Sequence, residues 1–222
     1  MPRILFEPEP CSVLASHLVS TLQLQPQSRR QKGDKGGYYF LTITVVEWIN
    51  IFTKPRYFEL LRDSLQFCID QKGLVLYEYV FMTNHIHLIA RASEDSDGLA
   101  LNRAYSGTGL DAIIRDFKRF TTQEIKKLLK EDNRSYILRV LKNSLKFKKG
   151  SEFQIWQREN YAEEIYSDEF RDTKVNYIHN NPVKKQYVLR PEDWLYSSAR
   201  QKIQELEPDH PNVVLPCAKW EV

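Results

Sequence analysis

Cysteine is scarce in this chain of 222 residues, which has only Cys11, Cys68 and Cys217. Three widely spaced thiols form neither a disulfide framework nor a CxxC metal site, and they fit a reducing cytoplasm. Long hydrophobic runs are also lacking, because no apolar stretch approaches the roughly 18 residues that suggest a membrane span. The opening sequence MPRILFEPEPCSV carries early acids and prolines, so we expect no secretion signal. These absences favour a cytoplasmic protein with no membrane partner.

Apolar and aromatic residues are not scarce. They make up 42% and 12% of the chain, which excludes wholesale disorder. The net charge is only +3, but twelve basic and four acidic residues fall between 115 and 149, so the rest of the chain is net acidic. Such segregation suits a polyanionic partner. The alternative, a solvated helix face, stays open.

The hydrophobic pattern predicts four strands and three helices. We expect strands over 38–48, 74–82, 85–92 and 152–156, and helices over 55–72, about 110–130 and 168–180. Pro182 is expected to end the last helix. The order β-α-β-β-α-β with a further helix predicts an α+β, ferredoxin-like split βαβ fold: an antiparallel sheet with helices on one face, plus a C-terminal helix.

The domain organisation predicted from composition has three parts. Residues 1–35 end in a polar, Gly/Lys/Arg-rich stretch and are interpreted as a flexible arm. Residues 36–200 form the catalytic domain, in which the polar and basic segment 131–150 is expected to be a mobile insertion. Residues 201–222 form a C-terminal tail.

Two histidines stand close together in the stretch FMTNHIHLIA, in a chain with only five. Alternation along a strand places His85 and His87 on one face, beside an Asn-containing turn. Two imidazoles on one face could converge on a small ion. A plain structural pair is the alternative.

The last predicted helix, DEFRDTKVNYIHNNPV, carries Tyr177 and Asn181 four residues apart and therefore on the same side. A phenol is a poor nucleophile at neutral pH because its pKa is about 10. A cation bound by His85, His87 and Asn181 could polarise a phosphodiester, which Tyr177 would then attack to form a covalent phosphotyrosine. A helix tyrosine is, however, more often a packing or surface residue.

Other residues compete for these roles. His179 is an alternative ligand, but it lies about 200° round the helix from Tyr177 and should face away. Tyr161, Tyr166 and Tyr196 are competing tyrosines; we interpret Tyr161 as packing and Tyr196 as a core anchor. Ser197 and Ser198 could contact phosphate or cap a local turn, and both interpretations stay open.

The candidate residues for binding a polyanion such as DNA are basic. On the helix over 110–130 the cations alternate with phenylalanines and are expected to contact the phosphate backbone of such a partner, whereas the lysines near 150 could grip a double-stranded stem or keep a loop soluble. The set is Arg115, Lys118, Arg119, Lys146, Lys148, Lys149 and Arg158.

Several stretches resemble one known family. MTNHIHLIA resembles the HUH signature (His, bulky apolar, His) of the single-tyrosine, IS200-type transposases. YIHNNPVKKQYV followed by RPEDWLYSSA resembles the subgroup of REP-associated tyrosine transposases, and WQRENYAEEIYSDE is similar to the stretch before that subgroup's catalytic helix. The similarity runs from about 37 to 199 in the family's order.

The resemblance implies a mechanism and a partner. It assigns His85 and His87 as ligands of Mg²⁺ or Mn²⁺, Asn181 as the third ligand, and Tyr177 as the nucleophile that links to the DNA 5′ phosphate and releases a 3′ hydroxyl. The partner would be single-stranded DNA with a hairpin, such as a REP-like palindrome. We expect a monomer acting in cis, with a homodimer as the alternative.

The chain also departs from the family pattern. Thr83 stands where the family usually has proline, PVKKQYV lacks the usual glycine, and the region 93–155 is longer than in compact members. A non-enzymatic alternative is a catalytically silent, domesticated DNA-hairpin-binding protein. A histidine-triad phosphohydrolase is disfavoured, because it would need a histidine where the chain has Ile89.

Overall fold

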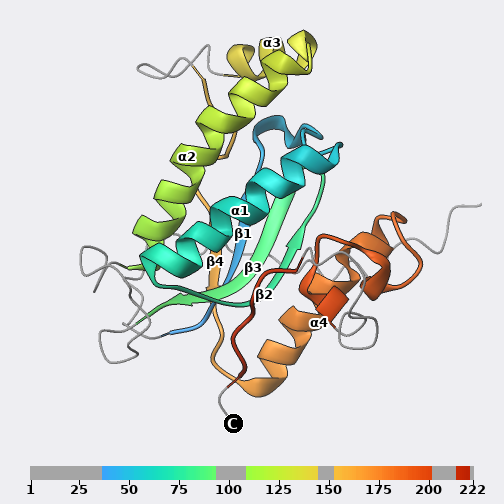
Figure 1. The fold of residues 1–222 in the computed structure, drawn as a ribbon. Helices are drawn as coiled ribbons and strands as arrows, with labels where there is room; N and C mark the ends of the chain where they lie inside the picture. Colours follow the sequence, from blue (N-terminus) through green and yellow to red (C-terminus); the bar gives the residue numbers. More distant parts are fainter. Residues whose placement is uncertain (1–36, 94–108, 145–152, 202–213, 221–222) are drawn as a thin grey trace, which may run out of the picture. The chain divides into compact units, whose positions relative to one another are not determined.

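The computed structural model describes residues 37–93, 109–144, 153–201 and 214–220. Its four-stranded sheet has the order β2-β3-β1-β4, and every neighbouring pair is antiparallel. The strands are β1 (Tyr39–Thr44), β2 (Leu74–Phe81), β3 (His85–Ala92) and β4 (Tyr161–Glu164). Helix α1 (Pro55–Lys72) joins β1 to β2, and α2 (Leu110–Glu131) lies between β3 and β4 (Figure 1). This is the predicted split βαβ, ferredoxin-like arrangement, so the predicted fold class is confirmed.

Local signals set the ends of α1. Pro55 stands at the first helical position, where its missing N–H would have no helical partner. Gly73 ends the helix in the left-handed region, with φ 69°, and a Cβ there would collide with the side chain of Ser93. The helix therefore begins and ends where the sequence predicted.

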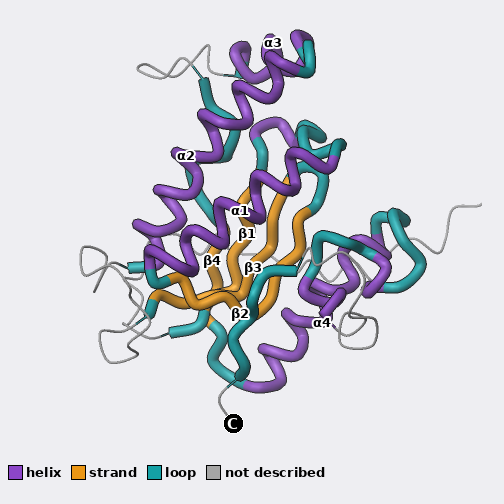
Figure 2. The backbone as a smooth tube through the Cα atoms, viewed as in Figure 1, coloured by secondary structure: helices purple, strands orange, loops and turns teal. Residues whose placement is uncertain are grey.

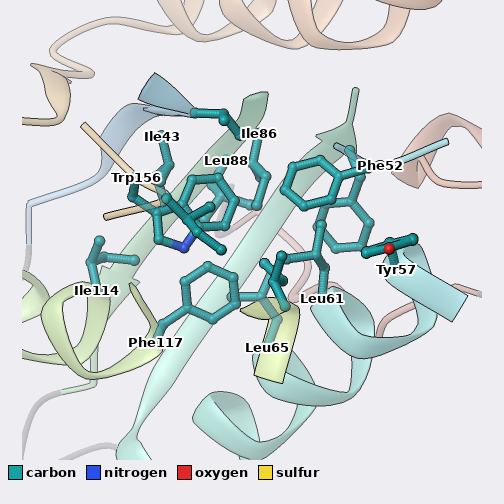
Figure 3. Packing of buried hydrophobic residues seen from close by; sticks show 14 of the residues in the cluster. Ile43, Phe52, Tyr57, Leu61, Leu65, Ile86, Leu88, Ile114, Phe117 and Trp156 are labelled. Carbon is teal, nitrogen blue, oxygen red and sulfur yellow. The ribbon is translucent and has the colours of Figure 1, made fainter. Parts of the chain in front are cut away.

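The main core lies between the sheet and the pair α1 and α2, which cover one face of the sheet in Figure 2. Ile86 and Leu88 of β3 pack here with Leu61 of α1 and Phe117 of α2 (Figure 3). All four side chains are nearly inaccessible, and each contributes roughly 1.5–3 kcal/mol by its burial. This packing holds β3 rigidly from one side.

A second cluster lies on the other face of the sheet. Its buried members include Phe40 of β1, Ile89 of β3 and Ile178 of α4 (Asp168–Lys184). Because His85 and His87 alternate with the core residues of β3, both imidazoles project to this second face. The helix that carries Tyr177 therefore covers the sheet face that carries the histidines.

The prediction of the fourth strand is wrong. Of the predicted segment, Trp156 forms only an isolated bridge with Val45, and the strand that pairs with β1 is Tyr161–Glu164. Ile155 and Trp156 are apolar because they are buried in the main core, where the Trp156 indole N–H donates to Thr121 Oγ1 at 2.9 Å. An exposed edge strand such as YAEE has no such apolar signal.

The first strand is shorter than predicted. It ends at Thr44, and the chain turns through a 3-10 helix, Val46–Trp48. Glu47 and Trp48 both adopt left-handed backbone angles, with φ 54° and 53°. Their β-strand composition does not reveal this turn.

The expected mobile insertion contains a helix, α3 (Ser135–Asn143), so that prediction is wrong for this part of 131–150. Ile137 and Leu141, four residues apart, are buried members of the main core. Residues 145–150 lie outside the described part of the chain.

Helix α4 does not end before Pro182 but runs through it to Lys184. Pro182 lies in the last turn, where the loss of one N–H affects a single hydrogen bond, and its ring is buried. The N–H of Lys185 still donates to the carbonyl of Asn181 at 3.1 Å. The extra turn keeps Asn181 within the helix.

Part of the predicted C-terminal tail lies against β2. The Ala218 N–H donates to the Leu76 carbonyl at 2.7 Å, and the Trp220 ring stacks on Tyr77 with 4.4 Å between centroids. The predicted arm 1–35 lies outside the described residues. None of the helices in the described ranges has the length and apolar character needed to cross a bilayer.

Candidate active site

The two imidazoles occupy adjacent same-face positions of β3. His85 lies opposite Thr44 and His87 opposite Thr42 across the pairing with β1. Their ring centroids are 4.7 Å apart, and the residues are only 6% and 4% exposed. The strand alternation therefore brings the two rings together as the sequence predicted.

Asn84 determines the tautomer of His85. The Asn84 amide nitrogen donates to the carbonyl of Trp48 at 3.0 Å, so its side-chain oxygen must face His85 Nδ1, which lies 2.7 Å away. An amide oxygen can only accept, so Nδ1 carries the proton and Nε2 keeps its lone pair. His85 can therefore ligate a cation through the lone pair of Nε2.

His87 is held in a similar way by Thr42, whose hydroxyl oxygen lies 2.9 Å from Nδ1. The other ring nitrogen, His87 Nε2, is buried and has no hydrogen-bond partner in the part of the chain that the structure describes. An orphaned buried polar atom costs about 1–3 kcal/mol, so it needs a functional explanation. A bound cation would give this nitrogen a partner.

Both imidazoles are kept neutral by their surroundings. Burial lowers the pKa of His85 to about 4, and the charge of Lys185 acts in the same direction while a hydrogen bond with Asn181 opposes it. Burial also lowers the pKa of His87 to about 3, with help from His85 and Lys174. At neutral pH both nitrogens that could bind a metal are therefore unprotonated.

Helix α4 brings Tyr177 and Asn181 to the same place. The Tyr177 ring lies 5.1 Å from that of His87 and 5.8 Å from that of Phe40, between centroids. Tyr177 is 40% exposed, whereas Asn181, which bonds to His85, is 6% exposed. Within the described ranges, no group of three or more His, Cys, Asp or Glu side chains is placed to hold a metal ion.

Comparisons with known proteins test the family resemblance seen in the sequence. No family model matches the chain. A protein of Haemophilus influenzae, provisionally named as a REP-associated tyrosine transposase, is 26% identical over 181 residues, which is 81% of this chain and 90% of the relative. The resemblance to the REP-associated tyrosine transposases is confirmed.

A solved structure shows the same fold. A REP-associated tyrosine transposase bound to a REP hairpin aligns with a TM-score of 0.55 and 18% identity, over 87% of this chain and 94% of that one. A transposase-like protein of Deinococcus radiodurans aligns with a TM-score of only 0.38 and 14% identity, over 69% of this chain and 97% of that one.

The position of α4 is held by a polar cluster that the sequence did not reveal. His179 Nε2 lies 2.8 Å from Glu78 Oε2, and the Ser198 hydroxyl donates to the same oxygen at 2.6 Å. Ser198 also lies within hydrogen-bond distance of the backbone of Tyr79. His179 thus faces away from the two strand imidazoles, as expected, and connects α4 to β2.

The other tyrosines lie in different environments. Tyr196 stacks on Phe58 with 3.8 Å between centroids, which fits a core anchor. Tyr161 is 58% exposed and donates to Glu163, so its interpretation as a packing residue is wrong. It lies on the short edge strand, which leaves most of its ring in solvent. Tyr166 is 78% exposed and stacks on Phe170.

The basic candidates on α2 do not lie beside Tyr177, because α2 packs on the opposite face of the sheet from α4. Arg115 and Arg119 project into solvent with side chains 73% and 76% exposed, near Asp116. Lys118 instead turns inward, and its ammonium donates to the carbonyls of Gln157 and Arg158 and to the side chain of Asn160. Burial lowers the pKa of Lys118 to about 8. Lys146, Lys148 and Lys149 lie outside the described residues.

Cations that the sequence analysis did not select surround Tyr177. Lys184 Nζ lies 5.3 Å from the centre of the Tyr177 ring, and Lys174 Nζ lies 4.7 Å from that of Phe40. Lys185 is close enough to lower the pKa of His85. Lys174 lies three residues before Tyr177 within the predicted helix, so its spacing was an available signal, whereas Lys184 lies on the helix only because α4 continues through Pro182.

Proposed function

We propose that this protein is a metal-dependent endonuclease and strand transferase of the HUH type, which cleaves and rejoins single-stranded DNA near hairpins through a covalent 5′-phosphotyrosine. One observation carries the proposal: the half-exposed Tyr177 ring packs beside His87, whose buried Nε2 has no hydrogen-bond partner among the described residues. A phenol and a nitrogen that could bind a cation thus lie side by side.

The side chains present fit a divalent cation. Nε2 of His85, Nε2 of His87 and the side-chain oxygen of Asn181 are three uncharged donors, so Mg²⁺ or Mn²⁺ held there would keep its positive charge for a phosphate. When bound, such an ion would supply Lewis-acid polarisation of the scissile phosphate and would neutralise charge that develops on it. The lowered pKa values keep both imidazoles ready to bind it at neutral pH.

The chain's own residues then carry the strand cleavage. The Tyr177 oxygen forms a bond to phosphorus, the bond from phosphorus to the 3′ oxygen breaks, and that oxygen gains a proton while the phenol loses one. The phosphodiester energy is conserved in the tyrosine link, so attack by a free 3′ hydroxyl reverses the step and joins DNA. Lys184, beside the ring, supplies positive charge near the reacting phosphate.

The substrate and assembly follow from the relatives and from the site. A solved relative is bound to a REP hairpin, which supports a hairpin-bearing strand as the substrate. The histidines and Tyr177 come together within one chain, which supports a monomer acting in cis. Cys68 and Cys217 are free thiols, which supports the cytoplasm as the compartment.

The test is formation of a covalent adduct. Protein is incubated with a labelled hairpin oligonucleotide and Mg²⁺ or Mn²⁺, then resolved on a denaturing gel. We expect an adduct for the native chain and for Tyr166→Phe, an exposed control, and none for Tyr177→Phe, which should still bind the hairpin. Hairpin binding by the native chain without any adduct in either metal would instead identify a catalytically silent DNA-binding protein.

A further inference from the structure

Trp48 is exposed at the edge of the candidate active site. Its side chain belongs to neither hydrophobic cluster of the described residues, and the residue is 57% exposed. Its ring lies 5.7 Å from that of His85, between centroids, at an interplanar angle of 67°. The indole therefore makes an edge-type contact with a candidate metal ligand, while most of the residue is open to solvent.

The backbone holds Trp48 in an unfavourable conformation. Glu47 and Trp48 have φ of 54° and 53°, a region that bulky residues rarely adopt, and strain of this kind gathers at binding sites. The Trp48 carbonyl accepts a hydrogen bond from Asn84, the residue that also sets the tautomer of His85. The Asn84 carbonyl in turn accepts from Val45 at 2.9 Å. The position of Trp48 is thus coupled to the geometry of the histidine.

Positive charge lies on the same side of the site. Lys185 acts on His85, the imidazole that Trp48 contacts, and Lys184 lies over the ring of Tyr177. A flat aromatic surface beside cations that can contact phosphate is the arrangement that binds single-stranded nucleic acid. One exposed indole offers too little area for a stable protein interface but matches the area of one base.

We propose that Trp48 is a stacking platform for one unpaired nucleobase, next to the phosphate that Tyr177 attacks. The inference rests on the proposed function for its ligand, single-stranded DNA. Stacking on Trp48 places the flanking backbone over His85 and His87. It also restricts cleavage to a position where a base is unpaired, because a paired base cannot leave its duplex stack without additional cost.

The test scans 2-aminopurine through the unpaired nucleotides beside the hairpin, with the full chain and EDTA so that no cleavage occurs. We expect quenching of fluorescence at one or two adjacent positions with the native chain. Trp48→Ala should lose this quenching and weaken hairpin binding about 5- to 100-fold, the range for one stacked base. Trp48→Phe should keep the quenching, because a smaller ring still stacks.

Phe67→Ala is the matched control. Phe67 lies on α1 and is 54% exposed, close to the exposure of Trp48, but α1 covers the other face of the sheet. We expect quenching and affinity like those of the native chain. Circular dichroism of each variant checks the fold, and the behaviour of Trp48→Phe keeps the test decisive if Trp48→Ala is misfolded.

The outcomes separate this inference from the proposed function. Unchanged quenching and affinity in Trp48→Ala, or loss of quenching in Trp48→Phe as well as in Trp48→Ala, overturns the platform even if Tyr177 forms its adduct. Quenching that depends on an aromatic residue at position 48 supports the platform even if the native chain forms no adduct.

Discussion

The side-chain oxygen of Asn84 accepts a hydrogen bond from Nδ1 of His85 across 2.7 Å, while the amide nitrogen of the same residue holds the carbonyl of Trp48. One amide therefore sets the proton on a candidate metal ligand and the position of an exposed aromatic ring. Such second-layer contacts orient the lone pair that a cation needs.

Removal of this amide should weaken metal binding. In Asn84→Ala the His85 ring loses the acceptor that keeps its proton on Nδ1, so we expect the affinity for Mn²⁺ to fall about 10- to 100-fold. Isothermal titration calorimetry of the purified chain measures it. Asn180→Ala, which removes an α4 amide that donates to the Asn176 carbonyl, is the control. Equal affinities in the two variants would contradict the assigned role.

The lowered pKa values of the histidines make the stability depend on pH. An unfolded histidine titrates near 6.5, whereas His85 and His87 do so near 4 and 3 in the fold. Stability from these groups is therefore fully present above pH 6.5 and is lost as pH falls toward 4 and 3, because only the unfolded chain takes up protons in between. From pH 7 to pH 5 we expect a loss of roughly 1–2 kcal/mol for each imidazole.

Thermal unfolding in EDTA checks this dependence without metal. The comparison is the double variant His85→Gln with His87→Gln, whose melting temperature should decrease less between pH 7 and pH 5 than that of the native chain. Parallel curves for the two proteins would show that the imidazoles are not held neutral.

The contact of His179 with Glu78 should matter for catalysis through the position of α4. Loss of this partly buried bond in His179→Ala costs about 1–3 kcal/mol and frees the helix that carries Tyr177. We expect slower adduct formation at saturating DNA with little change in hairpin affinity. His179→Gln, which can still donate to Glu78, should restore much of the rate. A purely structural role would lower the melting temperature of His179→Ala but leave the rate at saturating DNA unchanged.

The basic face of α2 should bind DNA backbone through its exposed arginines. Arg115→Ala with Arg119→Ala is expected to reduce the slope of log Kd against log salt concentration by about 2, one for each lost phosphate contact. Arg62→Ala, on α1, is the control. A salt slope equal to that of the native chain would show that other residues contact the hairpin.

Lys118, although in the same basic run, should behave differently. Its ammonium bonds to two carbonyls and an amide oxygen inside the protein. We therefore expect Lys118→Ala to lower the melting temperature and to leave the salt slope unchanged. A reduced slope with unchanged stability would show that Lys118 leaves its internal partners to bind DNA.

Much of the fold could be predicted because its signals are local. Pro55 and Gly73 bound α1, and the alternation around His85 and His87 defines the face of β3 on which the two imidazoles meet. The four-residue spacing of Tyr177 and Asn181 placed them on one side of a helix. Each of these features depends only on residues close together in the chain.

Other features are decided by contacts between distant segments. YAEE is a strand because its backbone pairs with β1, and Ile155 and Trp156 are apolar because the main core covers them. A local rule predicts that α4 ends before Pro182, but the helix continues through this proline to Lys184.

By itself, the sequence determined which reactive side chains this protein has and which face of a helix or strand each of them occupies. Only the tertiary structure decided that Tyr177 lies beside His87, whose Nε2 is buried without a hydrogen-bond partner in the described ranges. It also decided that His179 contacts Glu78 and that the arginines of α2 lie on the other side of the sheet from α4. The physical reason is that dihedral preferences and periodicity act over a few residues. Burial, pKa values and partners are set by side chains far away in the chain, as Glu78 is from His179.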